Sequence, residues 1–119
     1  MKKQSINFET WFDLNSKVCI YVPSTINVNE QIDNKEFCSK VQDKLSTLFG
    51  GATTQEVLGS YITEDGSKVI EKISIVYAFC DSEQLKKNIY KVVDICEWLK
   101  RTMTQESILL EVNNKAKFI

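Results

Sequence analysis

The chain has 119 residues, of which 43% are hydrophobic and 26% are charged, and its 16 acidic and 15 basic side chains leave a net charge of −1. This length and composition predict one globular domain with its own core, and the balanced charge argues against nucleic acid as a partner, because bulk electrostatic binding needs a basic excess. Histidine is absent, which excludes imidazole metal ligands and Ser-His or Cys-His nucleophilic pairs.

The first predicted unit is an aromatic N-terminal segment, residues 1–16, which contains Phe8, Trp11 and Phe12. Its basic residues are not followed by an apolar run, so it lacks the pattern of a secretory signal. We expect it to form an extra strand or to pack on the domain or on a neighbouring molecule. The domain itself then spans residues 17–119. Since no run approaches the ~18 apolar residues of a membrane helix, we expect no membrane partner and a cytoplasmic protein, in the host cytoplasm if a phage encodes it.

The first half of the domain is predicted to be a strand followed by a helix. Residues 17–23 alternate in the way typical of a strand, and residues 24–32 form a polar loop. Asp33 and Glu36 have the spacing of a capping box, and apolar residues recur behind them at helical spacing as far as Phe49.

Two adjacent glycines, Gly50 and Gly51, follow this helix. An anion-binding loop needs free N–H groups at a helix N-terminus, whereas a helix C-terminus presents carbonyl groups. No G-K-[ST] or G-x-G-x-x-G sequence accompanies the pair. The glycines therefore predict a left-handed residue that ends the helix, and not a phosphate site.

A β-hairpin comes next. Residues 53–63 are rich in β-forming side chains, and their alternation breaks near Gly59, which indicates a bulge or a close approach of the backbone. The turn sequence EDGS at 64–67 joins this strand to residues 68–80, the longest apolar run in the chain. Both faces of the second strand are largely apolar near its end, which predicts a central strand that is covered on both sides.

The last elements are a second helix and a final pair of strands. Asp81 and Gln84 are predicted to cap the helix, whose apolar stripe runs from Leu85 to Met103. Residues 107–113 are typical of a strand, and a tight turn leads from it into a short terminal strand. The order β-α-β-β-α-β is the split βαβ, or ferredoxin-like, arrangement of the α+β class, an antiparallel sheet with two helices on one face. We expect a homo-oligomer, dimeric or larger, in which a partner subunit covers the open sheet face.

The four cysteines, Cys19, Cys38, Cys80 and Cys96, are far apart, and each lies in an apolar run. We predict buried free thiols, with a disulfide pair or a metal cluster as the alternatives. The sequence shows no metal-ligand cluster and no cofactor fingerprint, so we predict neither a metal nor a cofactor, and no motif identifies a catalytic residue.

Two carboxylates are candidates for a polar site. Glu71 shares a strand face with Ile73 and Ile75, and Glu106 immediately precedes the last predicted strand. The two can act as an acid–base pair if the fold brings them close together. The alternative is that Glu71 lies near a sheet edge and Glu106 at the start of a strand, both in solvent.

A second candidate surface is the outer face of the second helix. On a helical wheel, Tyr90 and Trp98 lie opposite the apolar stripe, beside Lys91 and Arg101. Aligned aromatic residues flanked by cations can anchor a protein partner or stack on a base. Packing against the N-terminal aromatic segment explains them equally well.

The hairpin sequence GSYITEDGSKVIEKISIVYAF and the later TQESILLEV resemble an uncharacterised family of small bacterial and phage proteins. The resemblance covers residues 17–119, although Tyr61 stands where that family has tryptophan. The family has no assigned activity, so the resemblance implies the fold and a polar cluster. The matching positions are Gly59, Tyr61, Gly66, Glu71, Gln105, Glu106 and Ser107. From them we take as candidate ligand-binding residues Tyr61, Glu71, Gln105 and Glu106.

Two functional hypotheses follow. The first is a non-catalytic binding protein that self-associates and captures or blocks a partner, such as a phage-type inhibitor of host defence or a protein that sequesters a small nucleotide signal. The absence of histidine and of any catalytic motif favours it. The second is a cofactor-free enzyme of the dimeric α+β-barrel type, which uses Glu71 or Glu106 with Tyr61 in a pocket beneath the sheet.

Overall fold

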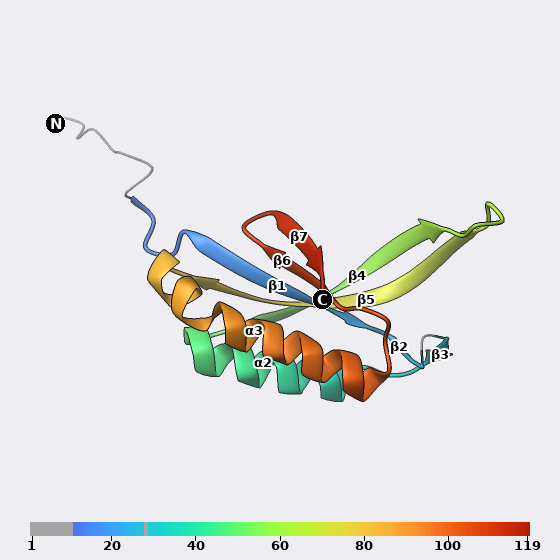
Figure 1. The fold of residues 1–119 in the computed structure, drawn as a ribbon, viewed down its shortest axis with the longest axis horizontal. Helices are drawn as coiled ribbons and strands as arrows, with labels where there is room; N and C mark the ends of the chain where they lie inside the picture. The colour runs from blue at the N-terminus through green and yellow to red at the C-terminus, as the bar shows by residue number, and fades with distance from the viewer. Residues whose placement is uncertain (1–10, 28) are drawn as a thin grey trace, which may run out of the picture.

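The computed structural model describes residues 11–27 and 29–119, and their elements follow the predicted order with small additions (Figure 1). Phe8 and most of the aromatic N-terminal segment lie outside the described residues, so the role of that segment stays a prediction. The element bounds are β1 Ser16–Pro23, β2 Thr25–Ile26, β3 Glu30–Gln31, α2 Lys35–Phe49, β4 Thr53–Ile62, β5 Lys68–Cys80, α3 Ser82–Met103, β6 Leu109–Val112 and β7 Lys115–Phe118.

In the described part of the chain, five strands form one antiparallel sheet in the order β4-β5-β1-β6-β7, and α2 and α3 cover the same face of it (Figure 1). The central strand β1 pairs with β5 along its whole length, from Ser16↔Cys80 to Pro23↔Ile73, and with β6 on its other side. With β7 set aside, this is the strand order of the ferredoxin-like fold. The predicted α+β fold class is confirmed.

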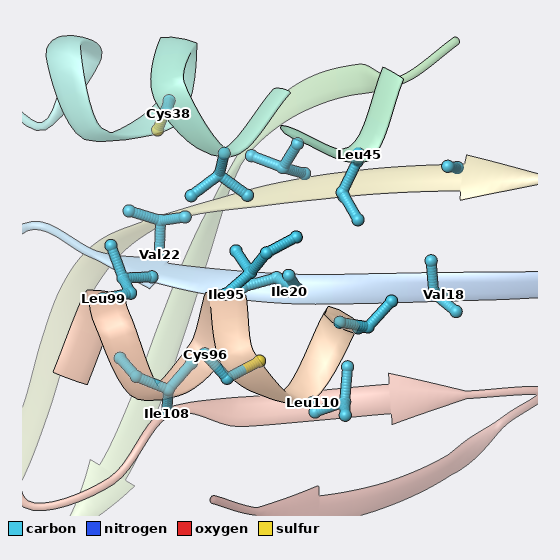
Figure 2. Close-up of a cluster of buried hydrophobic side chains, with 14 of the residues drawn as sticks. Val18, Ile20, Val22, Cys38, Leu45, Ile95, Cys96, Leu99, Ile108 and Leu110 are labelled. Carbon is cyan, nitrogen blue, oxygen red and sulfur yellow. The ribbon is translucent and has the colours of Figure 1, made fainter. Parts of the chain in front are cut away.

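The core lies between the sheet and the two helices (Figure 2). β1 contributes Val18, Ile20 and Val22, because alternate side chains of a strand point to the same face. Leu45 of α2 and Leu99 of α3 pack onto this layer from the apolar stripes of their helices, and all five side chains are fully buried. The apolar periodicity of the sequence therefore accounts for the layers that pack together.

The start of α2 differs from its prediction. The N-cap is Asn34, which makes no side-chain cap bond, so the predicted capping box of Asp33 and Glu36 is wrong. The Asn34 amide instead donates to the carbonyl groups of Val22 and Pro23, at 3.3 and 3.1 Å, and to Ser74 Oγ at 3.2 Å. These bonds fasten the beginning of the helix to β1 and β5.

The other predicted helix ends are confirmed. Gly50 after α2 is left-handed, with a φ of 89°, and its N–H donates to the Ser46 carbonyl at 2.7 Å. The glycine pair therefore ends a helix, as its position predicts. α3 starts with a capping box, in which the Gln84 N–H donates to Asp81 Oδ1 at 2.7 Å and the Asp81 N–H donates to Gln84 Oε1 at 3.2 Å.

The β4–β5 hairpin extends beyond the helices as an arm, which we define as residues 57–73 (Figure 1). Leu58, Ile62 and Ile70, on the side of the arm that continues the helix-covered face, are 72%, 65% and 61% exposed. They are solvent-exposed because α2 and α3 do not reach this part of the hairpin.

Gly59 lies in the arm opposite Glu71, and the pairing of β4 with β5 is unbroken across it. Of its two predicted roles, the bulge is therefore wrong. A close approach is confirmed, because a Cβ atom on Gly59 would stand 2.7 Å from Ile73 Cδ1.

The polar loop predicted at 24–32 contains a small hairpin, formed by β2 and β3. Each of its strands is only two residues long, which is too short to give an alternation pattern. The backbone N–H of Asn27 in this hairpin donates to the Met103 carbonyl at 3.0 Å, which ties the hairpin to the end of α3.

All four cysteines are buried free thiols, as predicted. Burial raises the pKa of each thiol, and raises that of Cys96, within α3, to about 12. Within residues 11–27 and 29–119, no three His, Cys, Asp or Glu side chains are grouped so as to hold a metal ion. No helix in these ranges combines the length and the apolar character needed to cross a membrane.

Candidate functional site

The sheet face opposite the helices, which we call the open face, is rich in apolar and aromatic side chains. It carries the odd-numbered residues of β1, β4, β5 and β6, because the register pairs odd positions with odd positions. Ile73, Ile75 and Tyr77 of β5 lie on this face and are half-buried, although α2 and α3 lie on the other face. Lys17 places its Nζ 4.4 Å from the centroid of the Tyr77 ring, so the face already holds a cation over an aromatic ring.

A cavity of about 510 Å³ is hollowed into this face between the arm, the end of β1 and the segment that joins α3 to β6. We call it the sheet-face cavity. All four predicted ligand-binding residues, Tyr61, Glu71, Gln105 and Glu106, line it. The fold thus brings the hairpin and the start of the last strand together, although their role in binding stays a prediction. The other lining residues are Tyr21, Pro23, Thr25, Ile73, Ser107, Ile108, Leu109 and Phe118.

The arm supplies Tyr61 and Glu71. Glu71 is half-buried, and because its partner on β4 is Gly59, no cross-strand side chain stands beside its carboxylate. Tyr61 lies two residues further along β4 on the same face, and its side chain is 51% exposed. The register of the hairpin therefore places a carboxylate and a phenol ring on the same face, where the Ile73 side chain fills the space over Gly59.

Gln105 is held in place by the chain around it. Thr104 takes a left-handed conformation that ends α3, and the Gln105 N–H then donates to the Lys100 carbonyl at 2.9 Å. The Gln105 side-chain Nε2 donates to the Thr25 carbonyl at 2.8 Å. Because this bond engages the NH₂ end of the amide, the amide oxygen is the atom with which Gln105 can accept a hydrogen bond from a ligand.

Sequence reasoning missed Tyr21, which lines the cavity, and its hydrogen-bond partner Glu111. The Tyr21 hydroxyl donates to Glu111 Oε1 at 2.7 Å, which joins β1 to β6 on the open face. The hydrogen bond to this carboxylate raises the pKa of Tyr21 to about 12. The two residues are far apart in the sequence, and only the pairing of β1 with β6 indicates that they meet.

A pH titration tests this bond. We expect the wild-type protein to show one phenol that titrates near pH 12 and that is missing from the Tyr21→Phe variant in ultraviolet difference spectra. The pKa of Tyr21 in the folded state lies above its unfolded value of ~10. The hydrogen bond to Glu111 therefore stabilises the fold fully below about pH 10, and this stabilisation is lost as the pH rises through about 12. Glu111→Gln should move the midpoint down, and a midpoint that does not move in that variant contradicts the assignment.

The charge of the cavity lining is one-sided. Glu71 and Glu106 contribute carboxylates, and the described lining residues include neither lysine nor arginine. Aromatic rings from Tyr21, Tyr61 and Phe118 complete the lining. Such a surface attracts cations and planar rings, and it repels phosphate groups.

The second predicted surface is changed by the structure at Trp98. Its predicted position opposite the buried stripe is wrong, because the ring is half-buried against the core in a groove between α2 and α3. Lys44 of α2 places its Nζ 5.0 Å from the ring centroid. The cause is that α3 buries Asn88 and Ile95, which the apolar stripe did not include, and so turns Trp98 toward α2.

The other three residues of that surface are where the wheel places them. Tyr90 is 80% exposed, and Lys91 and Arg101 are exposed on the same helix. Of the three, Lys91 borders the groove beside Trp98, and their role in binding a partner stays a prediction.

No protein-family model and no curated protein sequence matches this chain. Solved structures do match its fold. A phage SAM lyase in complex with S-methyl-5′-thioadenosine has a TM-score of 0.65 at 14% identity, with 92% of this chain and 94% of that chain covered. A phage SAM lyase in the apo state has a TM-score of 0.67 at 17% identity, covering 96% and 95%. CutA from Synechococcus elongatus PCC7942 has a TM-score of 0.51 at 12% identity, covering 86% and 79%.

At these identities the similarity shows the fold alone. It agrees with the ferredoxin-like arrangement of this chain, and it supports the sequence resemblance to the uncharacterised family only in the fold that the resemblance implies.

Proposed function

We propose that this protein is a cofactor-free enzyme that binds S-adenosylmethionine (SAM) in the sheet-face cavity and cleaves a C–S bond of its sulfonium group. The observation that carries the proposal is the convergence of Tyr61, Glu71 and Gln105 on one cavity lined by carboxylates and aromatic rings, with no lysine or arginine among its described residues. The similarity in fold to phage SAM lyases supports the choice of substrate and reaction.

The ligand and the cavity match in charge and shape. S-adenosylmethionine has a sulfonium and an ammonium cation, and a planar purine. The Glu71 carboxylate and the Gln105 amide oxygen are acceptors for the ammonium group. The rings of Tyr61 and Phe118 are partners for the sulfonium through cation–π attraction and for the purine through stacking. The volume of about 510 Å³ lies within the ~300–1,000 Å³ of ordinary ligand sites.

The proposed reaction balances without a co-reactant. The bond between sulfur and the methionine Cγ breaks, and its electron pair passes to sulfur, which becomes the neutral thioether of S-methyl-5′-thioadenosine. The substrate's own carboxylate oxygen forms the new bond to Cγ, so the second product is homoserine lactone. The protein acts by holding the ammonium group through Glu71 and Gln105 in a conformation from which this internal attack is possible.

Product analysis tests the proposal. Incubation of the purified protein with S-adenosylmethionine should give equal amounts of S-methyl-5′-thioadenosine and homoserine lactone, measured by chromatography with mass spectrometry. An unsaturated amino acid in place of the lactone would show instead that a base, with Glu71 the candidate, removes a proton from Cβ. Tight binding with no cleavage would favour the non-catalytic binding protein, and neither binding nor cleavage would refute the proposal.

Within the non-catalytic hypothesis, sequestration of a small nucleotide signal is the less well supported form. A phosphorylated nucleotide signal is anionic, and it would meet Glu71 and Glu106 in the cavity without a basic side chain among the described lining residues to compensate them. Sequestration of such a signal is therefore disfavoured, whereas inhibition of host defence through removal of S-adenosylmethionine is compatible with the enzyme.

We also propose that the protein is a homo-oligomer whose copies cover each other's open faces. The open face exposes three large aromatic residues, Phe118 (70% exposed), Tyr61 (51%) and Phe79 (49%). Apolar residues are exposed on the other side of the arm as well. A two-stranded hairpin is only marginally stable alone in water. An arm that is apolar on both sides is consistent with one that is packed between subunits, and a second copy over the open face would also cover the sheet-face cavity.

Light scattering checks this assembly. At micromolar concentration we expect a mass that is a multiple of the 13.7 kDa chain. Ile75→Asp places an unpaired carboxylate in the middle of the open face and should weaken association by about 100-fold, because burying such a charge costs several kcal/mol. Tyr90→Asp, on the exposed side of α3, should leave the mass unchanged. A wild-type mass of one chain would contradict the proposal.

A further inference from the structure

Tyr21 and Glu111 have no role in the bond changes proposed above, although Tyr21 lines the sheet-face cavity. They stand on the neighbouring strands β1 and β6, both are half-buried, and the Tyr21 hydroxyl donates to Glu111 Oε1 at 2.7 Å. The strand register fixes this meeting, because Glu111 is paired with Cys19, two residues before Tyr21 on the same face.

Among the residues that the structure describes, no basic side chain forms an ion pair with Glu111. The ion pairs of the described residues are Glu36–Lys40 and Glu97–Lys100, and both lie on helices. A half-buried carboxylate on an apolar face is costly unless a donor or a cation compensates the lost hydration. The Tyr21 hydroxyl supplies one donor, and a net negative charge remains beside the cavity.

Tyr21 belongs to the lining of the cavity, and its hydroxyl ties it to the Glu111 carboxylate. An aromatic ring attracts a cation through its face, and the attraction grows where water is excluded. The same sheet face shows this contact within the chain, since Lys17 Nζ lies 4.4 Å from the Tyr77 ring centroid. A cavity ring whose hydroxyl is bonded to a carboxylate therefore favours a positive centre over a neutral one of the same shape.

We propose that Tyr21 and Glu111 are specificity-determining residues that make the sheet-face cavity select ligands with a positive charge at the position of the sulfonium. The inference rests on the proposed function, because it concerns the same cavity. Its consequence is that the enzyme holds the cationic substrate more tightly than the neutral thioether compounds that share its adenosyl group.

Two ligands that cannot be cleaved by this route separate charge from shape. Sinefungin carries a protonated amine where S-adenosylmethionine has its sulfonium, and S-adenosylhomocysteine has a neutral thioether there. Calorimetric titration of the wild-type protein should give a dissociation constant about tenfold lower for sinefungin. Glu111→Gln should raise the dissociation constant of sinefungin about tenfold. The same substitution should raise the dissociation constant of S-adenosylhomocysteine less than about twofold. Tyr21→Phe keeps the ring but removes the hydrogen bond that holds the Glu111 carboxylate beside it, so it should act in the same direction.

Glu56→Gln is the matched control, because it makes the same chemical change on β4 outside the lining of this cavity. It should leave the dissociation constants of both ligands unchanged.

If Glu111→Gln and Tyr21→Phe weakened the binding of both ligands equally, the pair would only brace the sheet, which overturns the inference. Equal wild-type affinities for the two ligands would also overturn it while leaving adenosyl binding intact. No binding of either ligand would refute the proposed function itself. If Glu111→Gln does not fold, the two ligand constants of Tyr21→Phe decide the question.

Discussion

Replacement of Glu71 by glutamine is expected to lower kcat/KM for S-adenosylmethionine by about 100-fold or more. Glu71 is a half-buried carboxylate in the sheet-face cavity, and its cross-strand partner Gly59 offers no side chain that could replace it. Glutamine keeps the size of the side chain but removes the charge that pairs with the substrate ammonium. Loss of one partner of such a pair in a desolvated site costs roughly 2–5 kcal/mol, which corresponds to this factor. The measurement is the initial rate of S-methyl-5′-thioadenosine release.

Glu64→Gln is the control for this variant. Glu64 lies in the turn at the tip of the same arm, it is exposed, and it does not line the cavity. Its substitution should change the rate by less than about twofold, because exposed charges far from a ligand are screened by solvent and salt. Full activity in Glu71→Gln would show that the carboxylate has no part in the reaction, and the site would have to be assigned elsewhere.

The second large effect is expected for stability. Leu99→Ala should lower the free energy of unfolding by about 2–5 kcal/mol, because removal of a fully buried leucine loses its transfer free energy and leaves a cavity. Leu99 has no exposed surface and belongs to the same buried cluster as Ile20 and Ile108 (Figure 2). Urea unfolding followed by circular dichroism measures the change. The protein concentration must be the same for every variant, since self-association makes stability depend on it.

Thr102→Ala tests whether the effect belongs to burial. Thr102 lies three residues further along α3 and is exposed. Its substitution should change the free energy of unfolding by less than about 0.5 kcal/mol. If Leu99→Ala and Thr102→Ala had the same free energy of unfolding, Leu99 would lie outside the core, which would contradict the packing of α3 on the sheet.

The fold was largely predictable because its elements are long and periodic. The 13-residue strand β5 and the 22-residue helix α3 each have an apolar pattern that leaves little choice of structure. Predictions failed where the deciding contact comes from elsewhere in the chain. Asn34, rather than Asp33, begins α2 because its amide bonds to β1 and β5, and no local pattern contains that information. The two-residue strands β2 and β3 give no pattern at all.

The candidate site was predictable in part for the same reason. Tyr61 and Glu71 are on one hairpin, so their common face follows from local sequence, while their meeting with Gln105 required the strand order. Tyr21 and Glu111 were missed because each looks like an ordinary strand residue until β1 and β6 are paired. Trp98 was misplaced because one buried polar residue, Asn88, shifts the inward face of α3.

The four buried thiols give the chain its own set of reporters. Cys38, Cys80 and Cys96 belong to the core between the helices and the sheet, whereas Cys19 is an odd-numbered residue of β1 and faces the open side. A thiol reagent needs both access and a thiolate, and burial suppresses both at each position. The labelling rates of the three core thiols therefore follow the opening of the core. Cys19 is only 4% exposed although the open face is uncovered in the single chain, so its labelling rate follows local movement of the open-face side chains around it. Core opening and this local movement can therefore be timed separately in one unmodified protein.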